Sequence, residues 1–306
     1  MLHSKTHTHH THHTPTAPAP QTDLPTLSAM LQHNGPWTVL TGAGISTDSG
    51  IPVYRDENGD WKRPAPVQFK DFMTHESTRQ RYWARSLIGW PVFSQAQPNA
   101  AHTALAQLEQ AGWVQVVITQ NVDGLHQRAG SQQVIDLHGR LDQVICMGCG
   151  ALSTRADFQR QLLATNPHWG HLDAAAAPDG DADLSGVDFS AFHVPTCPRC
   201  GGILKPDVVF YGENVPAARK QLAMEQLAAS KALLVVGSSL MVHSGLRFVH
   251  AAKQLGLPVA AINLGVMRAD AELDYKVLEA AVPALQDLAA TLSIAINRAT
   301  LPLGEK

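Results

Sequence analysis

The sequence TGAGISTDSGIPVYRD at residues 41–56 directly follows a short apolar run, WTVL, at residues 37–40. The run is rich in β-forming residues and Gly42-Ala43-Gly44 ends it, so a strand followed by a turn is predicted. Because glycine has no Cβ, a ligand can approach such a turn closely. A helix opening at residues 45–49 would direct free N–H groups and its positive dipole end at a phosphate. The stretch indicates either a nucleotide-binding turn or an ordinary glycine-rich strand-to-helix loop.

Length and composition narrow the class of protein. The chain has 306 residues, 44% hydrophobic and 16% charged, which suits a globular enzyme with one large domain or two unequal ones. The formal net charge of −3 provides no basic field, so we expect neither nucleic acid nor a membrane as partner. Residues 1–24 are expected to form a disordered tail rich in His, Thr and Pro. They show no secretory or mitochondrial pattern, so a cytoplasmic location with reduced cysteines is expected.

Short β-rich runs alternate with helical segments along the chain. The predicted strands are residues 37–41, 114–119, 134–136, 232–237 and 259–263. Several are apolar on both faces, as buried parallel strands are. Helices are predicted after an N-cap at Asn99, with a stop at Gly112, and over residues 244–255 and 283–294. This alternation predicts an α/β fold with a Rossmann-like, doubly wound parallel sheet.

Two segments interrupt this alternation. Residues 58–97 are rich in aromatic residues and Arg and predict a helical insertion. Residues 141–204 contain all four cysteines and an acidic run at residues 174–183, which predicts a zinc-ribbon insertion with an exposed loop. Together they would form a smaller zinc-ribbon plus helical domain. The Rossmann-like domain is then assigned to residues 25–57, 98–140 and 205–299.

The cysteines form two CxxC pairs, Cys146 with Cys149 and Cys197 with Cys200, and a glycine follows each pair. Two such pairs can place four thiolates tetrahedrally around Zn²⁺, and a filled shell of this kind is structural. The 47 residues from 150 to 196 exceed the ~15–20 of a compact ribbon, so an insertion must loop out. A redox CxxC would need a single pair near a βαβ unit. We therefore predict one structural zinc.

Polar residues follow the predicted strands. TQNVDGLH at residues 119–126 supplies Gln120, Asn121 and Asp123, which could hold ribose hydroxyls and an amide group. DLHGR at residues 136–140 supplies His138, a candidate general base near neutral pH. A polar strand end can also be a plain cap, and a lone histidine can be structural.

Two further strand ends carry small polar residues, Gly237-Ser238-Ser239 and Asn263-Leu264-Gly265. Their hydroxyl and amide groups suit ribose and phosphate oxygens. The chain contains no Gly-Lys-Ser/Thr, which excludes a Walker-type phosphate loop. It also lacks GxGxxG spacing after Gly42, so dehydrogenase-like binding of a dinucleotide is not favoured.

Taken together, these motifs resemble the sirtuins, the NAD-dependent protein-lysine deacylases. The matching pieces occur in family order: GAGIS and GIPVYRD, TQNVDGLH, LHG, the paired CxxC, LKPDVVFYGE at residues 204–213, GSSL and NLG. RQRYWARSLIGWP at residues 79–91 and the stretch at residues 194–213 look closest to the class II branch. The resemblance implies a cleft in which NAD and an acylated lysine meet.

The resemblance also implies roles for individual residues. His138 would be the base and Asn121 a second catalytic residue. The substrate backbone would pair, as an added strand, with Val209, Phe210, Tyr211, Gly212 and Glu213. NAD would be held by Gly42, Ala43, Gly44, Ser46, Asp48, Tyr54, Arg55, Gln120, Asn121, Asp123, Gly237, Ser238, Ser239, Asn263, Leu264, Gly265 and Ala281.

The implied reaction moves the acyl group from lysine of a protein substrate to ADP-ribose and releases nicotinamide. Alternatives are a mono-ADP-ribosyltransferase, a lipoamidase or longer-acyl deacylase, and a non-enzymatic NAD-sensing module. Tyr82 and Arg85, at i and i+3 of a predicted helix, resemble the pair with which succinyl-preferring sirtuins grip an acidic acyl chain. They could equally belong to a solvated face.

Overall fold

The computed structural model describes residues 20–54, 66–170 and 186–299, together with residues 56, 58, 60 and 62. Side chains are described up to residue 293. The predictions for Arg55, for residues 1–19 of the tail and for the acidic run at residues 174–183 lie outside the described residues.

Six strands form one parallel sheet in the order β3-β2-β1-β7-β8-β9. They are β1 (Trp37–Thr41), β2 (Val114–Thr119), β3 (Val134–Asp136), β7 (Leu233–Val236), β8 (Val259–Ile262) and β9 (Tyr275–Val277). From β1 the chain adds strands first on one side and later, from β7 onward, on the other. The order therefore reverses between β1 and β7, where open α/β sheets bind their ligands. The predicted doubly wound sheet is confirmed.

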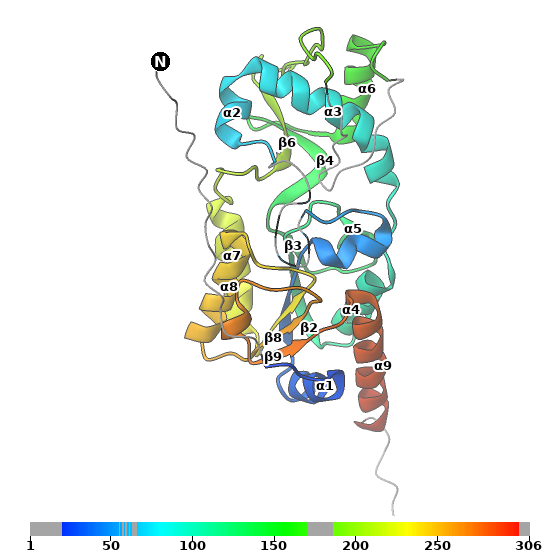
Figure 1. The fold of residues 1–306 in the computed structure, drawn as a ribbon, viewed down its shortest axis with the longest axis vertical. Helices are drawn as coiled ribbons and strands as arrows, with labels where there is room; N and C mark the ends of the chain where they lie inside the picture. Colours follow the sequence, from blue (N-terminus) through cyan, green and yellow to red (C-terminus); the bar gives the residue numbers. More distant parts are fainter. Residues whose placement is uncertain are drawn as a thin grey trace, which may run out of the picture.

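Helices cover both faces of this sheet (Figure 1). On one face lie α1 (Leu24–His33), α4 (Ala100–Gln110) and α9 (Ala281–Ala299), and on the other α7 (Ala217–Ala229) and α8 (His243–Gln254). Successive residues of β1 serve the two faces, because side chains alternate along a strand: Val39 packs with the first set and Leu40 with the second. The apolar runs in the sequence follow from this double burial.

A smaller unit lies beyond the carboxyl ends of the parallel strands, at the top of Figure 1. It contains α2 (Phe69–Thr74), α3 (Glu76–Gln95) and α6 (Arg155–Thr165), with an antiparallel sheet in the order β5-β4-β6. Its strands are β4 (Gly139–Cys146), β5 (Leu152–Thr154) and β6 (Leu204–Val208). Phe72, Trp83, Phe158 and Phe192 fill a core of their own. β4 begins directly after His138 and so joins the smaller unit to the end of β3.

Three local features differ from the sequence-based expectations. Within residues 20–24, expected in the tail, Thr22 donates its N–H to the Lys276 carbonyl and Asp23 caps α1 through the Thr26 N–H at 2.9 Å. Residues 45–49 lie in a 3₁₀ helix, η1 (Ala43–Ser49), so the helix starts earlier and is more tightly wound than expected. Strand β9 (YKV, three residues) is not predicted from the sequence, because its central residue is a lysine and the short run has no apolar pattern of its own.

The described part of the chain contains no helix that combines the length and the apolar character needed to cross a membrane.

Candidate active site

A cavity of about 600 Å³ opens at the carboxyl end of the parallel sheet. The loops after β1, β2, β7 and β8 and the segment after β6 form its walls. The cavity brings together most of the residues singled out from the sequence: Gly42, Ala43, Gly44, Asp48, Tyr54, Tyr82, Gln120, Asn121, His138, Val209, Phe210, Tyr211, Gly212, Glu213, Gly237, Ser238, Ser239, Asn263, Leu264, Gly265 and Ala281.

Of the described residues predicted to bind NAD or substrate, three do not line this cavity. Ser46 and Asp123 line a smaller adjoining pocket of about 30 Å³, and Asn121 lines both spaces. Arg85 lines neither of them, although Tyr82, three residues before it on α3, lines the large cavity. Of this pair, only Tyr82 therefore contributes to the wall of the cavity.

The glycines after β1 and β7 let these two loops touch. A Cβ on Gly44 would lie 2.8 Å from Cα of Gly237, and a Cβ on Gly237 would lie 2.5 Å from the backbone nitrogen of Ile45. Gly237 also has φ +60°, a conformation that favours glycine. A Cβ on Gly42 would lie 2.7 Å from Cβ of Ser238. The glycines thus serve close contact between loops at the point where the strand order reverses.

Gln120 ties the loop after β2 to the loop after β7. Its Nε2 donates to Oγ of Ser238 at 2.7 Å. On the other side its amide packs against the start of α8, because a Cβ on Gly245 would lie 2.6 Å from Oε1 of Gln120. Two predicted cofactor residues, Gln120 and Ser238, are therefore held in one hydrogen-bonded unit.

Ser46 is the centre of a buried polar network. Its hydroxyl donates to Oδ2 of Asp123 at 2.8 Å and accepts from Nδ2 of Asn121 at 3.0 Å. Nε2 of His102 lies 3.4 Å from the same oxygen. Since Nδ1 of His102 accepts the Asn99 N–H, Nε2 carries the ring proton and donates to Ser46. The network sets the positions of Asn121 and Asp123.

Burial determines the charge of this network. It lowers the pKa of His102 to about 4, so the ring is neutral at pH 7. Burial also raises the pKa of Asp123, although hydrogen bonds from Leu125 and Ser46 oppose the shift. A second histidine, His126, packs edge-on against His102 with ring centroids 4.9 Å apart, and its pKa is lowered to about 3, mainly by burial.

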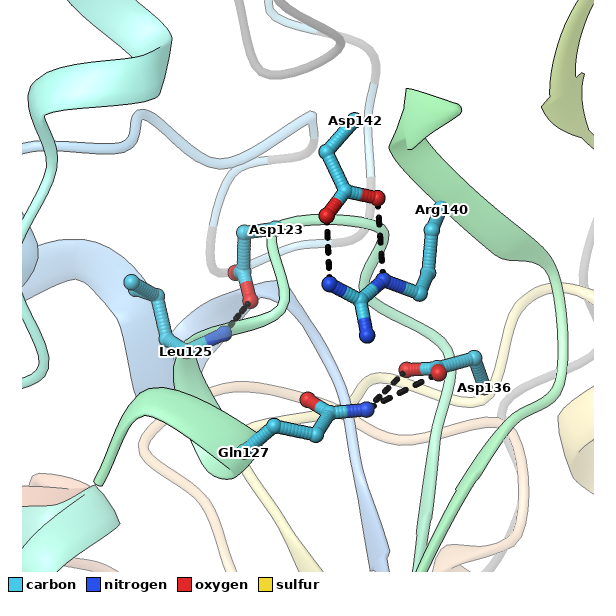
Figure 2. Close-up of polar contacts among 6 residues, drawn as sticks. All are labelled: Asp123, Leu125, Gln127, Asp136, Arg140 and Asp142. Atoms are coloured by element: carbon cyan, nitrogen blue, oxygen red, sulfur yellow. Dashed lines mark hydrogen bonds and ion pairs between the residues drawn. The ribbon is translucent and has the colours of Figure 1, made fainter. Parts of the chain in front are cut away.

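A second polar group supports the loop that carries Asp123 (Figure 2). Gln127, on α5 (Leu125–Arg128), donates to both carboxylate oxygens of Asp136 at 3.0 and 2.9 Å. Arg140 forms an ion pair with Asp142. The Arg140 guanidinium also packs against Gly124, because a Cβ on Gly124 would lie 3.3 Å from Nη2 of Arg140. These contacts join the end of β3, α5 and β4. These contacts hold the turn between Asp123 and α5 in place. The residues that make them, Gln127, Asp136, Arg140 and Asp142, line neither the large cavity nor the small pocket.

His138 meets two fixed partners. Its Nδ1 lies 2.9 Å from the backbone oxygen of Gln120, and its Nε2 lies 2.7 Å from Oγ of Ser244. A carbonyl oxygen can only accept, so Nδ1 carries the proton and Nε2 carries a lone pair. Burial lowers the pKa of His138 to about 4, opposed by the Gln120 carbonyl and reinforced by the positive charge of Arg219. The imidazole is therefore a neutral base whose lone pair is on Nε2.

Ser244 is a site residue that the sequence does not reveal. It lies in the first turn of α8 and lines the cavity. Its serine type and its spacing match no motif, and only the tertiary contact with His138 identifies it.

The segment from β6 to Glu213 runs along the cavity beside His138. The backbone N–H of Val209 donates to the His138 carbonyl at 2.8 Å, and Tyr211 accepts from the Phe69 N–H at 2.8 Å. Buried Lys205 holds the far end through Oε2 of Glu213 at 3.1 Å. The same oxygen accepts the backbone N–H of Phe210 at 2.9 Å. The segment is held at both ends and bends at Gly212, which has φ +78°, where the Glu213 N–H donates to the Phe210 carbonyl at 3.0 Å. The part before this turn is a suitable partner for a substrate backbone.

The four cysteine sulfurs of the two CxxC pairs lie within 4.8 Å of one another. Cys146 and Cys200 are 3.5 Å apart, and Cys149 and Cys197 are 3.8 Å apart. A Cβ on Gly202 would lie 2.9 Å from the Cys146 sulfur, so glycine there leaves room for the cluster. Four thiolates in this arrangement fit one structural zinc ion, as predicted.

Known proteins match the chain over most of its length. The model of the Sir2 family matches residues 42–244. An "NAD-dependent protein deacetylase" of Xanthomonas axonopodis pv. citri is 60% identical over 266 residues, 87% of this chain and 91% of that protein. An "NAD-dependent protein deacetylase 2" of Bradyrhizobium diazoefficiens is 61% identical over 247 residues, 81% of this chain and 90% of that protein.

Solved structures agree in fold. A structure described as "Sir2-p53 peptide-NAD+" has a TM-score of 0.69 at 28% identity and covers 89% of this chain and 100% of that chain. One described as "Sir2 bound to acetylated peptide" has a TM-score of 0.70 at 29% identity, with coverage of 89% and 100%.

Proposed function

This chain belongs to the Sir2 family, and we propose that it is an NAD-dependent protein deacetylase acting on acyl-lysine proteins. The observation that carries the proposal is His138, a neutral base that lines the cavity formed by the strand ends and whose Nε2 lone pair is bound by the Ser244 hydroxyl. Bound NAD supplies the ribose that accepts the acyl group and loses nicotinamide. The residues of the chain bind and orient NAD and the acyl-lysine, and His138 acts as the base.

The residues present fit NAD. Both amide hydrogens of Asn121 are engaged, by the Gly42 carbonyl and Ser46. Its Oδ1 is then the atom left to accept from a carboxamide. We assign Gln120, Asn121 and Asp123 to the nicotinamide ribose and carboxamide. The adenosine half is assigned to the ends of β7 and β8 and to the start of α9: Gly237, Ser238, Ser239, Asn263, Leu264, Gly265 and Ala281. The loop after β1 would lie along the cofactor through Gly42, Ala43, Gly44, Asp48 and Tyr54.

His138 is proposed as the general base and Asn121 as the second catalytic residue. Because the Gln120 carbonyl holds Nδ1–H, the ring keeps one orientation while a proton arrives at Nε2. Val122, Leu141 and Phe210 add apolar wall to the same cavity, which limits the access of water to the reacting groups.

The substrate peptide is proposed to add a strand along residues 209–213, consisting of Val209, Phe210, Tyr211, Gly212 and Glu213. The support is the start of this segment, which follows strand β6: the Val209 N–H donates to the His138 carbonyl and the Phe210 N–H donates to Oε2 of Glu213 before the chain turns at Gly212. Recognition through main-chain groups would give affinity with little dependence on the substrate sequence.

The test is nicotinamide release from NAD, measured with and without an acetylated peptide. The proposal expects release only with the peptide, and its loss in His138→Ala with zinc content unchanged. Transfer of label from NAD to protein without an acyl group would contradict it in favour of ADP-ribosyl transfer. Binding of NAD without turnover on any acyl-lysine peptide would contradict it in favour of a sensing module.

Finer assignments extend the proposal. The motifs at residues 79–91 and 194–213 support a class II sirtuin, and the two separate cores support two domains. Strands β4 and β6 cross the proposed boundaries near residues 140 and 205, and Val208 and Phe210 pack in the core of the smaller unit. Tyr82 lines the cavity whereas Arg85 does not, which supports acetyl over an acidic acyl chain. The four cysteines, which form no disulfide, and the net charge of −3 support a cytoplasmic protein with protein substrates, without nucleic acid or membrane as partner.

A further inference from the structure

The hydroxyl group of Ser244 occupies the place from which His138 would receive a proton. Nδ1 is committed to the Gln120 carbonyl, so the lone pair is on Nε2, and Oγ of Ser244 lies 2.7 Å from it. With a lone pair on Nε2, the Ser244 hydroxyl must be the donor. The ribose hydroxyl of NAD can give its proton to His138 in only two ways: it displaces Ser244 from Nε2, or it passes the proton through the Ser244 hydroxyl.

Ser244 is held rigidly in this place. It lies in the first turn of α8, and its neighbour Leu246 is 4% exposed. Gly245 packs so closely on the side chain of Gln120 that an added Cβ would lie 2.6 Å from Oε1. The start of α8 is therefore pressed against the same residue whose backbone oxygen orients His138. Both partners of the imidazole belong to one packed assembly.

We propose that Ser244 is a catalytic residue that relays the proton from the reacting ribose hydroxyl of NAD to His138, an inference that rests on the proposed function. Oγ of Ser244 would accept the proton of the ribose hydroxyl while the Ser244 proton moves to Nε2 of His138. His138 would become an imidazolium, the ribose hydroxyl would have lost its proton, and the serine would be regenerated. No other reactant is needed.

The relay keeps every polar group paired. After the transfer, Oγ of Ser244 accepts from the new Nε2–H and donates to the ribose oxygen, while Nδ1–H stays on the Gln120 carbonyl. Displacement of Ser244 would instead break the 2.7 Å contact and leave its hydroxyl to find a new partner in a partly buried site. A hydroxyl group can serve as donor and acceptor in turn, which favours the relay.

Ser244→Ala and Ser244→Thr separate these possibilities in two kinetic assays on the full-length protein. Exchange of labelled nicotinamide into NAD, with an acetylated peptide present, reports nicotinamide loss and its reversal. Formation of deacetylated peptide reports the later, base-dependent transfer. The relay predicts that Ser244→Ala lowers deacetylation at least ~10-fold while exchange stays within ~2-fold, and that Thr restores most of the loss. Deacetylation that is unchanged or faster in Ser244→Ala would overturn the relay.

A second readout needs neither NAD nor peptide. In the free protein, the ¹⁵N resonance of His138 Nε2 should move toward that of an unbonded pyridine-type nitrogen in Ser244→Ala. It should stay near the wild-type position in Ser244→Thr and in the control Ser94→Ala, whose exposed hydroxyl bonds the Pro91 carbonyl. An unmoved signal in Ser244→Ala would overturn the contact on which the relay depends. A wild-type protein without peptide-dependent nicotinamide release would overturn the proposed function and the relay together, whereas normal wild-type turnover with unaffected Ser244→Ala would overturn the relay alone.

Discussion

Nδ1 of His138 lies 2.9 Å from the carbonyl oxygen of Gln120, and this contact makes Nε2 the basic nitrogen of the ring. The carbonyl is a backbone group at the end of β2, so its position follows from the sheet. The orientation of the base is therefore coupled to strand β2, and the loop after this strand carries Asn121 and Asp123. An active site built this way needs no third side chain to orient its histidine.

On the acidic side of the pH–rate profile, the loss of activity should follow the lowered pKa of His138, about 4 in the free protein. We expect kcat/KM for peptide to hold until the pH falls below about 5 and to fall as the imidazole is protonated. Arg219 contributes to this lowering of the pKa through its positive charge, so Arg219→Gln should move the loss of activity toward higher pH. Arg160→Gln, at an exposed pair on α6, is the control. A loss of activity that starts near pH 6.5 in the wild type would contradict the buried, neutral base.

Ser46→Ala should harm both stability and turnover. The change removes the acceptor for an amide hydrogen of Asn121 and the donor to Asp123, and both groups are part-buried. Groups left unsatisfied in this way cost roughly 1–3 kcal/mol. We expect a loss of that size in the urea-induced unfolding free energy and at least a ~10-fold lower kcat/KM for NAD. Ser94→Ala should stay within about 0.5 kcal/mol of the wild type. Equal losses in the two variants would contradict the network.

Gly237→Ala and Gly256→Ala form a matched pair. Both glycines have positive φ, +60° and +70°, so alanine strains the backbone at each by about 1 kcal/mol. Only at Gly237 does the new Cβ meet backbone, 2.5 Å from the Ile45 nitrogen, whereas nothing lies within 4 Å at Gly256. We expect Gly237→Ala to cost a further ~1–3 kcal/mol of unfolding free energy and to weaken NAD binding measured by calorimetry. Similar losses at the two positions would show that the loops after β1 and β7 can separate freely.

Zinc should be present at one ion per chain and should support the substrate segment. Cys149→Ser removes one of four thiolates, and the incomplete shell should lose the metal. Because β4 pairs with β6, loss of the metal should disturb the segment after β6 and raise KM for peptide more than KM for NAD. Metal analysis and steady-state kinetics test the two parts. A wild-type zinc ratio far below one per chain would contradict the site.

Stability should fall as the pH drops from 6.5 toward 4. The pKa of His102 is lowered from 6.5 to about 4 in the folded protein, so the unfolded chain binds more protons over this interval. The contribution of His102 is fully present above pH 6.5, is lost as the pH falls through its folded pKa, and amounts to roughly 3 kcal/mol. Unfolding free energies at pH 7, 6, 5 and 4 should fall less steeply in His102→Gln. Parallel curves for the two proteins would exclude this histidine as a source of the acid sensitivity.

Local patterns in the sequence were sufficient to predict much of the fold and part of the candidate active site. Strands such as β1 and β7 are apolar on both faces because helices bury them on both faces, so their pattern is visible without the structure. The cysteine spacing likewise encodes the zinc site, because each CxxC places two ligands from one turn. His138 could be singled out because a polar residue ending a buried strand must lie at the ligand-binding edge.

Other features depend on contacts between segments distant in sequence. Strand β9 is three residues long, and pairing with β8, not a pattern of its own, defines it. The steric need for Gly237 exists only because η1 lies against it. Ser244 is 106 residues from His138 in the chain, and only the packing of α8 against the end of β2 brings its hydroxyl to Nε2. The sequence by itself determined which side chains are offered at the strand ends. The tertiary structure decided which ring nitrogen is basic and what it touches, because those depend on the placement of a backbone carbonyl and a serine hydroxyl from other segments.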